Sequence, residues 1–290
     1  MDLSETKQLL AEYDIRPTRS LGQNFLIDGR VVDRLCAGAE ITGNDFILEI
    51  GPGLGSLTKE LASARAIKAI EIDKNMVKIL ADTLSSYNNI EVIHADALKT
   101  DFNSIAEGFD SVKVAANLPY YITTQLIEKL IVELVHARLM LLMMQKEASD
   151  RLFAMPGSKL YGPVSILIAL YGKAEKYQKV SAASYYPRPH VDSIVIKLVK
   201  SGEAYQSDAS SPSGFALMNL ESRRSFHRFL NACFSQRRKT FANVIKNSVY
   251  CRLASEGLLG VLFSKYGLAD TVRAEQLAPK LFLELFHMLQ

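Results

Sequence analysis

Three glycines in the first third of the chain have the spacing to bring the backbone close to a ligand. The segment ILEIGPGLGSLT places Gly51, Gly53 and Gly55 between an apolar run and a helix-like stretch. Glycine lets the backbone turn tightly and approach a ligand with no Cβ in the way. The dinucleotide pattern G-x-G-x-x-G would need glycine where Ser56 stands, so a pyrophosphate cradle is disfavoured. The alternative is a tight strand-to-helix turn that binds nothing.

Two carboxylates further along narrow the expected ligand. Glu71 lies 20 residues after Gly51, where a carboxylate can accept hydrogen bonds from both hydroxyls of a ribose. Asp96, in the segment HADAL, can accept a hydrogen bond from the exocyclic amine of an adenine, although an N-cap for a following helix explains Asp96 alone nearly as well. Together with the glycines, these carboxylates predict a bound adenosine. A nucleoside without phosphates points to S-adenosylmethionine.

The segment VKVAANLPYY, residues 112–121, ends an apolar run in an unusual corner. Asn117, Leu118, Pro119, Tyr120 and Tyr121 stand where an ordinary loop would offer Gly, Asp or Ser. Pro119 biases Leu118 toward an extended conformation and so fixes the direction of the Leu118 carbonyl. The alternative interpretation is a strand-ending proline turn with two core tyrosines. Tyr121 is expected to pack behind the loop.

Apolar runs and amphipathic stretches alternate from about residue 46 and predict an α/β fold that positions these residues. The expected buried strands are 46–50, 66–72, 90–95, 112–116 and 139–144. Helix-period stretches lie between them, which implies right-handed crossovers and a mostly parallel sheet covered on both faces. Two further strands are expected at KAEKYQKV and SIVIKLVK, after a helical stretch from Glu147 and a loop that contains PGSKLYGP.

The composition is that of an ordinary globular protein, with 48% apolar and 22% charged residues among 290. The cysteines Cys36, Cys233 and Cys251 form no C-x-x-C pair, which indicates neither a disulfide framework nor a zinc site and favours a reducing cytosol. The five histidines show no metal-ligand spacing, and no apolar run approaches the ~20 residues of a membrane span. We therefore expect a cytoplasmic protein with no metal and no membrane segment.

Positive charge is concentrated near the carboxyl end of the chain. The net charge is only +3, but residues 214–252 hold eight of the 34 Lys and Arg residues and only one of the 31 acids, Glu221. The remainder therefore has 26 basic and 30 acidic residues, a net of −4. Localised positive charge of this kind favours a polyanion partner, and a solvated helix face is the alternative.

Six motifs, in order along nearly the whole chain, resemble those of the ribosomal RNA adenine dimethyltransferases, the kasugamycin-sensitivity family. They are LGQNFLID (21–28), EIGPGLGSLT (49–58), NLPYY (117–121), QKEASDR (145–151), YYPRPHVDS (185–193) and FSQRRKT (234–240). The resemblance implies an α/β fold with a class I, Rossmann-like, S-adenosylmethionine-dependent methyltransferase sheet in residues 1–200. A small polar linker at 201–214 and an all-helical RNA-binding domain at 215–290 would follow.

The resemblance also implies the roles of individual residues. The residues expected to contact S-adenosylmethionine are Asn24, Leu26, Gly51, Gly53, Glu71, Asp96 and Asn117. The NLPY corner would be the site where the target adenine is methylated.

An adenine amine is a poor nucleophile because its lone pair is delocalised into the ring, so the enzyme must favour a pyramidal nitrogen. Asn117 Oδ1 and the Leu118 carbonyl are the expected acceptors, and no strong base or metal is needed. Tyr120 offers a face on which an adenine turned out of its helix can stack, worth ~1 to 3 kcal/mol per base. A second platform is expected at Tyr185, with Tyr186 or ordinary packing left open as alternatives.

The motif FSQRRKT is expected to grip RNA. Arg237, Arg238 and Lys239 would share one helical turn beside apolar residues, and Arg223 and Arg224 would add to the same basic face. In the resembled family this domain helps to hold ribosomal RNA.

The leading hypothesis is therefore an enzyme that dimethylates two adjacent adenosines in a 3′-terminal hairpin loop of small-subunit (16S) ribosomal RNA, coupled to subunit maturation. We expect a monomer whose partner is the small ribosomal subunit. The alternatives are a large-subunit ribosomal RNA methyltransferase of the antibiotic-resistance type and a non-catalytic RNA-binding assembly or transcription factor on the same fold.

Overall fold

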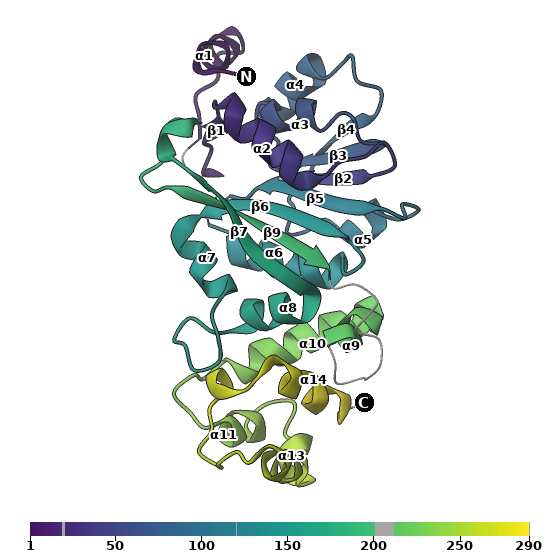
Figure 1. Ribbon diagram of the computed structural model, residues 1–290, viewed down its shortest axis with the longest axis vertical. Helices are drawn as coiled ribbons and strands as arrows, with labels where there is room; N and C mark the ends of the chain where they lie inside the picture. Colours follow the sequence, from purple (N-terminus) through teal and green to yellow (C-terminus); the bar gives the residue numbers. More distant parts are fainter. Residues whose placement is uncertain (19–20, 120, 201–211, 290) are drawn as a thin grey trace. The chain divides into compact units, whose positions relative to one another are not determined.

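The computed structural model of the protein describes residues 1–18, 21–119, 121–200 and 212–289 (Figure 1). The chain forms two compact units. Unit 1 comprises Met1–Lys129, His136–Ser149 and Ala174–Lys200, and unit 2 comprises Leu130–Val135, Asp150–Lys173 and Ser201–Gln290. The division expected from the sequence kept 130–135 and 150–173 with the first domain, whereas here both segments group with the C-terminal helices. The expected linker lies outside the described residues as far as 211, and helix α9 begins at Pro212.

Unit 1 carries a seven-stranded sheet in the order β4-β3-β2-β5-β6-β9-β7. Its strands are β2 (Phe46–Ile50), β3 (Ala66–Glu71), β4 (Ile90–His94), β5 (Val112–Asn117), β6 (Leu139–Gln145), β7 (Gly172–Val180) and β9 (Ser193–Lys200). Strands β2 to β6 are parallel, and β9 runs antiparallel to β6. The five expected parallel strands and the two later strands are confirmed.

The strand order places the chemistry at one edge of the sheet. The chain runs outward from β2 through β3 to β4, then returns to the other side of β2 to form β5 and β6. Such a reversal opens a crevice at the carboxyl ends of the strands, where ligands bind in sheets of this kind. Strands β2, β3 and β5 are in register at their last apolar residues, so the next residue of each lies at the same level. These residues are Gly51, Glu71 and Asn117.

Helices cover this sheet, and several of them are started by side-chain caps. Those that lie wholly or mainly in unit 1 are α1 (Leu3–Glu12), α2 (Gly29–Ala39), α3 (Ser56–Glu60), α4 (Lys74–Thr83), α5 (Phe102–Ile105), α6 (Thr123–Glu133), α7 (Lys146–Leu152) and the 3-10 helix η2 (Ala182–Ser184). Asp28, Asp73 and Asp101 accept hydrogen bonds from the first backbone N–H groups of α2, α4 and α5. Helices α3, α4, α6 and α7 correspond to the expected helical stretches.

The amino-terminal segment has structure that the periodicity did not predict. Asp2 and Glu5 form a capping box at the start of α1. A two-stranded antiparallel ladder joins β1 (Phe25–Leu26) to β8 (Tyr185–Tyr186). This ladder ties two of the sequence motifs together although they lie about 160 residues apart in the chain.

Helices α2 and α3 pack on one face of the sheet. Their buried residues, such as Leu35 and Leu57, share a core cluster with Ile47, Leu141 and Val195 from β2, β6 and β9. Apolar residues on both faces of β2, β5 and β6 are almost fully buried, which explains why these strands are nearly continuous apolar runs in the sequence.

A buried ion pair stabilises the opposite edge of the sheet, at the amino ends of β2 and β5. Lys113 Nζ lies 2.9 Å from Asp45 Oδ2, and both side chains are almost inaccessible. The Ser111 hydroxyl and the Thr42 backbone N–H also donate hydrogen bonds to the Asp45 carboxylate. The carboxylate is therefore fully engaged, far from the carboxyl ends of the strands.

Unit 2 is built from helices around an aromatic core. Its helices are α8 (Pro163–Tyr171), α9 (Pro212–Leu217), α10 (Leu220–Cys233), α11 (Phe241–Lys246), α12 (Arg252–Ser255), α13 (Leu258–Tyr266), the 3-10 helix η4 (Ala274–Gln276) and α14 (Pro279–His287). Phe226, Phe229 and Phe286 contact one another with ring centroids 5.3 to 6.4 Å apart. The Tyr161 hydroxyl donates a hydrogen bond to the Leu277 carbonyl at 2.9 Å, which ties the PGSKLYGP loop to the segment that leads into α14.

No helix among the described residues has both the length and the apolar character needed to cross a membrane.

Candidate functional site

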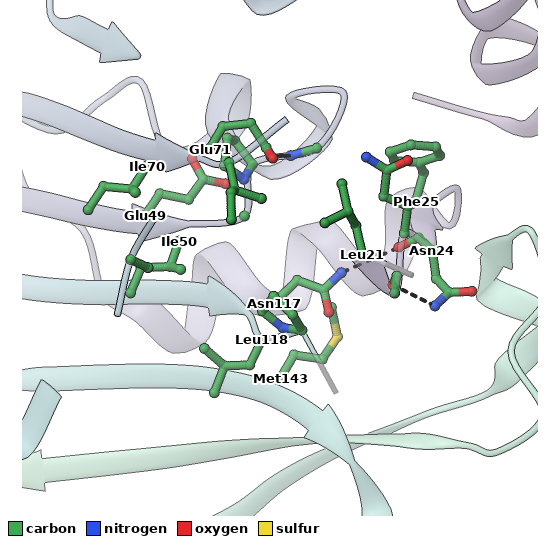
Figure 2. Close-up of a pocket in the computed structure, with 18 of the residues that line it drawn as sticks. Leu21, Asn24, Phe25, Glu49, Ile50, Ile70, Glu71, Asn117, Leu118 and Met143 are labelled. Atoms are coloured by element: carbon green, nitrogen blue, oxygen red, sulfur yellow. Dashed lines mark hydrogen bonds between the residues drawn. The ribbon is translucent and has the colours of Figure 1, made fainter. Parts of the chain in front are cut away.

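A pocket opens at the carboxyl ends of β2, β3 and β5 in unit 1 (Figure 2). It encloses about 1080 Å³ of empty space, with its open mouth included. All seven residues that the sequence predicted for cofactor binding line this pocket. They are Asn24, Leu26, Gly51, Gly53, Glu71, Asp96 and Asn117.

The glycine loop needs glycine for two reasons. Gly51 and Gly53 have φ angles of +70° and +59°, in the left-handed region that residues other than glycine rarely adopt. A Cβ at Gly51 would lie 3.2 Å from the Asn117 carbonyl oxygen, and one at Gly53 would lie 3.2 Å from Cδ1 of Phe25. The loop is therefore packed closely against both the NLPY corner and the amino-terminal segment.

Glu71 is held by backbone donors at the floor of the pocket. Its Oε2 accepts a hydrogen bond from the Gly53 N–H at 3.3 Å, and its Oε1 accepts one from the Asp73 N–H at 2.9 Å. Burial raises the pKa of Glu71 above its ordinary value, although these hydrogen bonds oppose the rise. The carboxylate is thus oriented before any ligand arrives.

Glu49 is a second buried carboxyl in the pocket wall, and sequence reasoning missed it. It lies on β2 close to Glu71 (Figure 2), and its Oε2 has no hydrogen-bond partner among the described residues. Burial raises the pKa of Glu49 to about 8; the Thr58 hydroxyl opposes this rise, and the charge of Glu71 adds to it. A signal was present, because a charged residue interrupts an otherwise apolar strand at ILEI.

Asp96 lies in the wall of the pocket, and the helix that the sequence allowed after it is absent. It lines the pocket, and its Oδ1 accepts a hydrogen bond from the Leu98 N–H at 2.9 Å. Residues 97–99 form a turn rather than a helix, so Asp96 caps a turn at the mouth of the pocket. Its Oδ2 lies 3.7 Å from Lys99 Nζ, and the side chain is about one-third exposed.

The NLPY corner lies beside this pocket, with Asn117, Leu118 and Pro119 all in its wall. Asn117 Nδ2 points toward the Asn24 carbonyl oxygen at 3.5 Å (Figure 2). Because the amide nitrogen faces that carbonyl, Asn117 Oδ1 is directed elsewhere. The Leu118 N–H donates to the Met143 carbonyl at 2.9 Å, which anchors the corner to β6. Tyr120 lies outside the described residues.

The other tyrosines differ from their expected positions. Tyr121 does not pack behind the loop: it is 57% exposed and lines the pocket. Tyr185 is only 2% exposed, belongs to the core cluster beneath α2, and its hydroxyl donates to the Met143 sulfur at 2.9 Å. The expectation that a base stacks on Tyr185 is therefore corrected, because its ring faces the core. Tyr186 is more accessible, and Lys7 lies over its ring.

The basic residues of unit 2 are less available than their number suggests. Arg223 is buried, and its guanidinium donates to the carbonyls of Val132 and Met218, so its expected role in RNA binding is corrected to a structural one. Four other cations have acidic partners: Arg224 with Glu133, Arg228 with Glu221, Arg237 with Glu275 and Arg252 with Glu256. Most of these acids come from outside residues 214–252, which is why counting charge along the sequence overestimated the free positive charge.

The FSQRRKT motif forms a turn between helices α10 and α11, and not the expected helical turn. Residues 234–239 are non-helical, and Thr240 accepts a hydrogen bond from the Asn243 N–H to start α11. Arg237 donates to the Tyr161 carbonyl at 2.8 Å. Arg238 and Lys239 are exposed and make no ion pair with any described residue. Phe241 and Val244 are buried, as the apolar pattern predicted.

Comparisons with known proteins agree with this geometry. A profile described as "Ribosomal RNA adenine dimethylase" matches residues 16–290. A protein of Clostridium botulinum (strain Kyoto / Type A2) named ribosomal RNA small subunit methyltransferase A is 38% identical over 281 residues, which cover 97% of this chain and 96% of that protein. Its namesake in Geobacillus thermodenitrificans is 43% identical over 84% of this chain and 81% of its own length.

Two solved structures have a similar fold. A dimethyladenosine transferase from Plasmodium falciparum superposes with a TM-score of 0.69 at 29% identity, covering 90% of this chain and 95% of that one. The 23S rRNA methyltransferase ErmE superposes with a TM-score of 0.59 at 23% identity, covering 92% and 99%. The similarity to ErmE supports only a shared fold.

Proposed function

The chain belongs to the ribosomal RNA adenine dimethylase family, and from this we propose that it transfers methyl groups from S-adenosylmethionine to the N6 atoms of two adjacent adenosines in small-subunit ribosomal RNA. The target is a hairpin loop near the 3′ end of that RNA, and the reaction accompanies maturation of the subunit. The observation that carries the proposal is that residues from three of the six motifs, together with Glu71 and Asp96, converge on one pocket beside the NLPY corner.

Three features of the pocket wall are suited to S-adenosylmethionine. Gly51 and Gly53 bring backbone to places that a Cβ would fill. Glu71 presents a carboxylate held by two backbone donors, suited to ribose hydroxyls. Glu49 adds a buried oxygen atom with no hydrogen-bond partner among the described residues, which a bound ligand could satisfy. When bound, S-adenosylmethionine supplies an electrophilic methyl group on a sulfonium.

Asn117 and Leu118 aim the adenine amine. The Asn24 carbonyl orients the Asn117 amide, which leaves Asn117 Oδ1 to accept a hydrogen bond from the amine. The Leu118 carbonyl is fixed by Pro119 on one side and by the Leu118 N–H bond to Met143 on the other. Two acceptors outside the ring plane favour a pyramidal nitrogen, whose lone pair can then attack. The proton becomes acidic once the nitrogen is alkylated and leaves to water.

Aromatic contacts hold the RNA bases at the mouth of the pocket. We infer that the target adenine stacks on Tyr120, as the family motif implies. We add Tyr121 as a second stacking platform, because its side chain is exposed and lines the pocket. A substrate with two adjacent adenosines needs a place for the neighbour of the reacting base, and the Tyr121 ring suits that base.

The basic turn of unit 2 supplies non-specific grip on the RNA backbone. Arg238 and Lys239 are exposed cations without acidic partners among the described residues. Arg237 and Arg224 form ion pairs with Glu275 and Glu133 but remain partly exposed. They therefore contribute more weakly to phosphate binding. Phosphate contacts of this kind position the enzyme without reading sequence.

The competing substrates are less well supported. Relatives that are 37 to 43% identical carry the name of a small-subunit methyltransferase, whereas the 23S rRNA enzyme is only 23% identical. A non-catalytic role is opposed by the intact set of Glu71, Asp96 and Asn117 in one pocket.

The test is to incubate the protein with methyl-labelled S-adenosylmethionine and, in separate reactions, unmethylated small subunits, large subunits and DNA, and then to map the modified base. We expect label only in small-subunit RNA, at two adjacent adenosines. Label in large-subunit RNA alone, or in none of the three despite tight cofactor binding, would replace this function by one of its competitors.

A further inference from the structure

An amide and a carboxylate outside the reacting corner fasten the amino-terminal segment to the sheet. Gln23 Nε2 donates a hydrogen bond to Asp73 Oδ2 at 2.7 Å, across 50 residues of sequence. Gln23 Oε1 accepts a hydrogen bond from the Thr18 backbone N–H, also at 2.7 Å. Because both ends of the amide are engaged, its orientation is fixed, and Gln23 joins its own segment to the loop that follows β3.

Asp73 belongs to the same short loop that holds Glu71. The Asp73 backbone N–H donates to Glu71 Oε1 at 2.9 Å, and Asp73 Oδ1 accepts from the Asn75 N–H to cap α4. Glu71 in turn accepts from the Gly53 N–H. Hydrogen bonds therefore connect Gln23, Asp73, Glu71 and the glycine loop in one continuous chain.

The fastened segment forms one wall of the pocket. Leu21, Gly22, Gln23 and Asn24 all line it. Beyond Gln23, this wall is held by the two-residue ladder of β1 and by the 3.5 Å contact between Asn24 and Asn117. The Gln23 bond is much shorter than that contact, and it ends on a carboxylate, which strengthens it. Its loss would leave Leu21 to Asn24 with weaker attachments to the rest of the pocket.

We propose that Gln23 and Asp73 are positioning residues for the cofactor pocket, whose hydrogen bond holds the Leu21 to Asn24 wall in place and thereby sets the affinity for the adenosyl ligand. The inference rests on the proposed function, in which this pocket binds S-adenosylmethionine. Neither side chain touches the reacting amine, so the pair acts on binding and not on the methyl-transfer step.

A swapped pair distinguishes positioning from a general effect on folding. Gln23→Glu places a carboxylate against Asp73 and breaks the bond, while it keeps an acceptor for the Thr18 N–H. Asp73→Asn still accepts from a glutamine and still caps α4, because Asn and Asp are equivalent N-caps. In the double variant, the asparagine amide at position 73 donates to the glutamate carboxylate at position 23, and the bond is restored with its polarity reversed.

The matched control breaks a different bond between the same two segments. The Tyr13 hydroxyl donates to Asp82 at the far end of α4, and neither residue lines the pocket. Tyr13→Phe therefore loosens α1 without touching the wall. Thermal unfolding of every variant reports any loss of folding separately from loss of binding.

The experiment measures binding of S-adenosylhomocysteine to the full chain by calorimetry, together with KM for S-adenosylmethionine and kcat on small subunits. We expect Gln23→Glu to weaken binding about tenfold, equal to about 1.4 kcal/mol, and to raise KM by a similar factor with kcat at saturation unchanged. Tyr13→Phe should bind like the unaltered protein. Asp73→Asn should lose less affinity than Gln23→Glu, because its neutral acceptor keeps the bond in a weaker form. The double variant should recover most of the affinity that Gln23→Glu loses.

Equal affinity in Gln23→Glu, or failure of the double variant to recover, would overturn the positioning role while leaving the proposed function intact. Absence of S-adenosylhomocysteine binding to the unaltered protein would overturn both.

Discussion

Replacing Glu49 by glutamine should remove a pH-dependent penalty on folding. Burial raises the pKa of this carboxyl from 4.5 to about 8. Between these values the folded protein keeps a proton that the unfolded chain has lost, so the free energy of unfolding falls as the pH rises. Each pKa unit corresponds to about 1.36 kcal/mol, and the contribution lost between about pH 4.5 and pH 7 is therefore about 3 kcal/mol. Glutamine has nearly the same shape and no charge to bury.

The measurement is urea unfolding of both proteins, without cofactor, from pH 5 to pH 8 at fixed ionic strength. The stability of Glu49→Gln relative to the unaltered chain should rise by about 1.4 kcal/mol per pH unit in the middle of this range and by less near pH 5 and pH 8. Glu91→Gln on strand β4, which β3 separates from β2, is the control, because Glu91 is 62% exposed, and its difference should stay flat. A difference for Glu49→Gln that is also independent of pH would refute the reasoning that this carboxyl is protonated in the folded protein.

Three further changes test other parts of the molecule. Tyr121→Ala should raise KM for small subunits by about five- to a hundredfold, as loss of one stacked base predicts, with Tyr121→Phe near normal; steady-state kinetics on small subunits decide this. Reversing charge at Arg238 and Lys239 should flatten the slope of log K for RNA against log salt by about 2, and an unchanged slope would move the contact elsewhere. Asp45→Asn should lower the free energy of unfolding at pH 7 by at least about 2 kcal/mol, measured by urea unfolding. Burial alone would raise the pKa of Asp45, but hydrogen bonds from groups that include Lys113 lower it to about 2. The stabilisation by Asp45 is therefore lost as the pH falls from about 4 to about 2.

The parallel sheet and its ligand edge could be predicted from the sequence because their signals are local. Each buried strand is a short apolar run, and three functional residues of the pocket, Gly51, Glu71 and Asn117, come directly after the apolar residues of such a run. The parallel arrangement then brings them together without further information.

The errors come from contacts between segments far apart in the chain. The sequence suggests that Arg223 is a surface cation, whereas in the structure it is buried and donates a hydrogen bond to the Val132 carbonyl. The sequence does not show that Tyr185 is buried, because the ladder between β1 and β8 decides which of Tyr185 and Tyr186 faces the core. Nor does it show that Tyr121 is exposed. The periodicity of FSQRRKT predicts a helix, whereas these residues form a turn and the cap at Thr240 starts a new helix after it.

Two pocket residues escaped sequence reasoning for a related reason. Gln23 is an unremarkable polar residue in LGQNFLID until the fold places it beside Asp73. Glu49 looked like part of an apolar strand, and its chemical importance follows only from its complete burial next to Glu71. Local pattern identifies the edge of the sheet, but long-range packing identifies which side chains there are buried or engaged.

The central claim is that the NLPY corner aims an adenine amine at the methyl donor, and Asn117→Ala tests it most directly. Mass spectrometry of nucleosides from treated small subunits measures N6-methyladenosine and N6,N6-dimethyladenosine for the unaltered protein and for the variant at saturating S-adenosylmethionine. We predict dimethyladenosine at two adjacent positions for the unaltered protein, and a rate about 10²- to 10³-fold lower for a folded Asn117→Ala protein, the usual effect of removing one aligned polar contact. Near-normal turnover in that variant would contradict the claim.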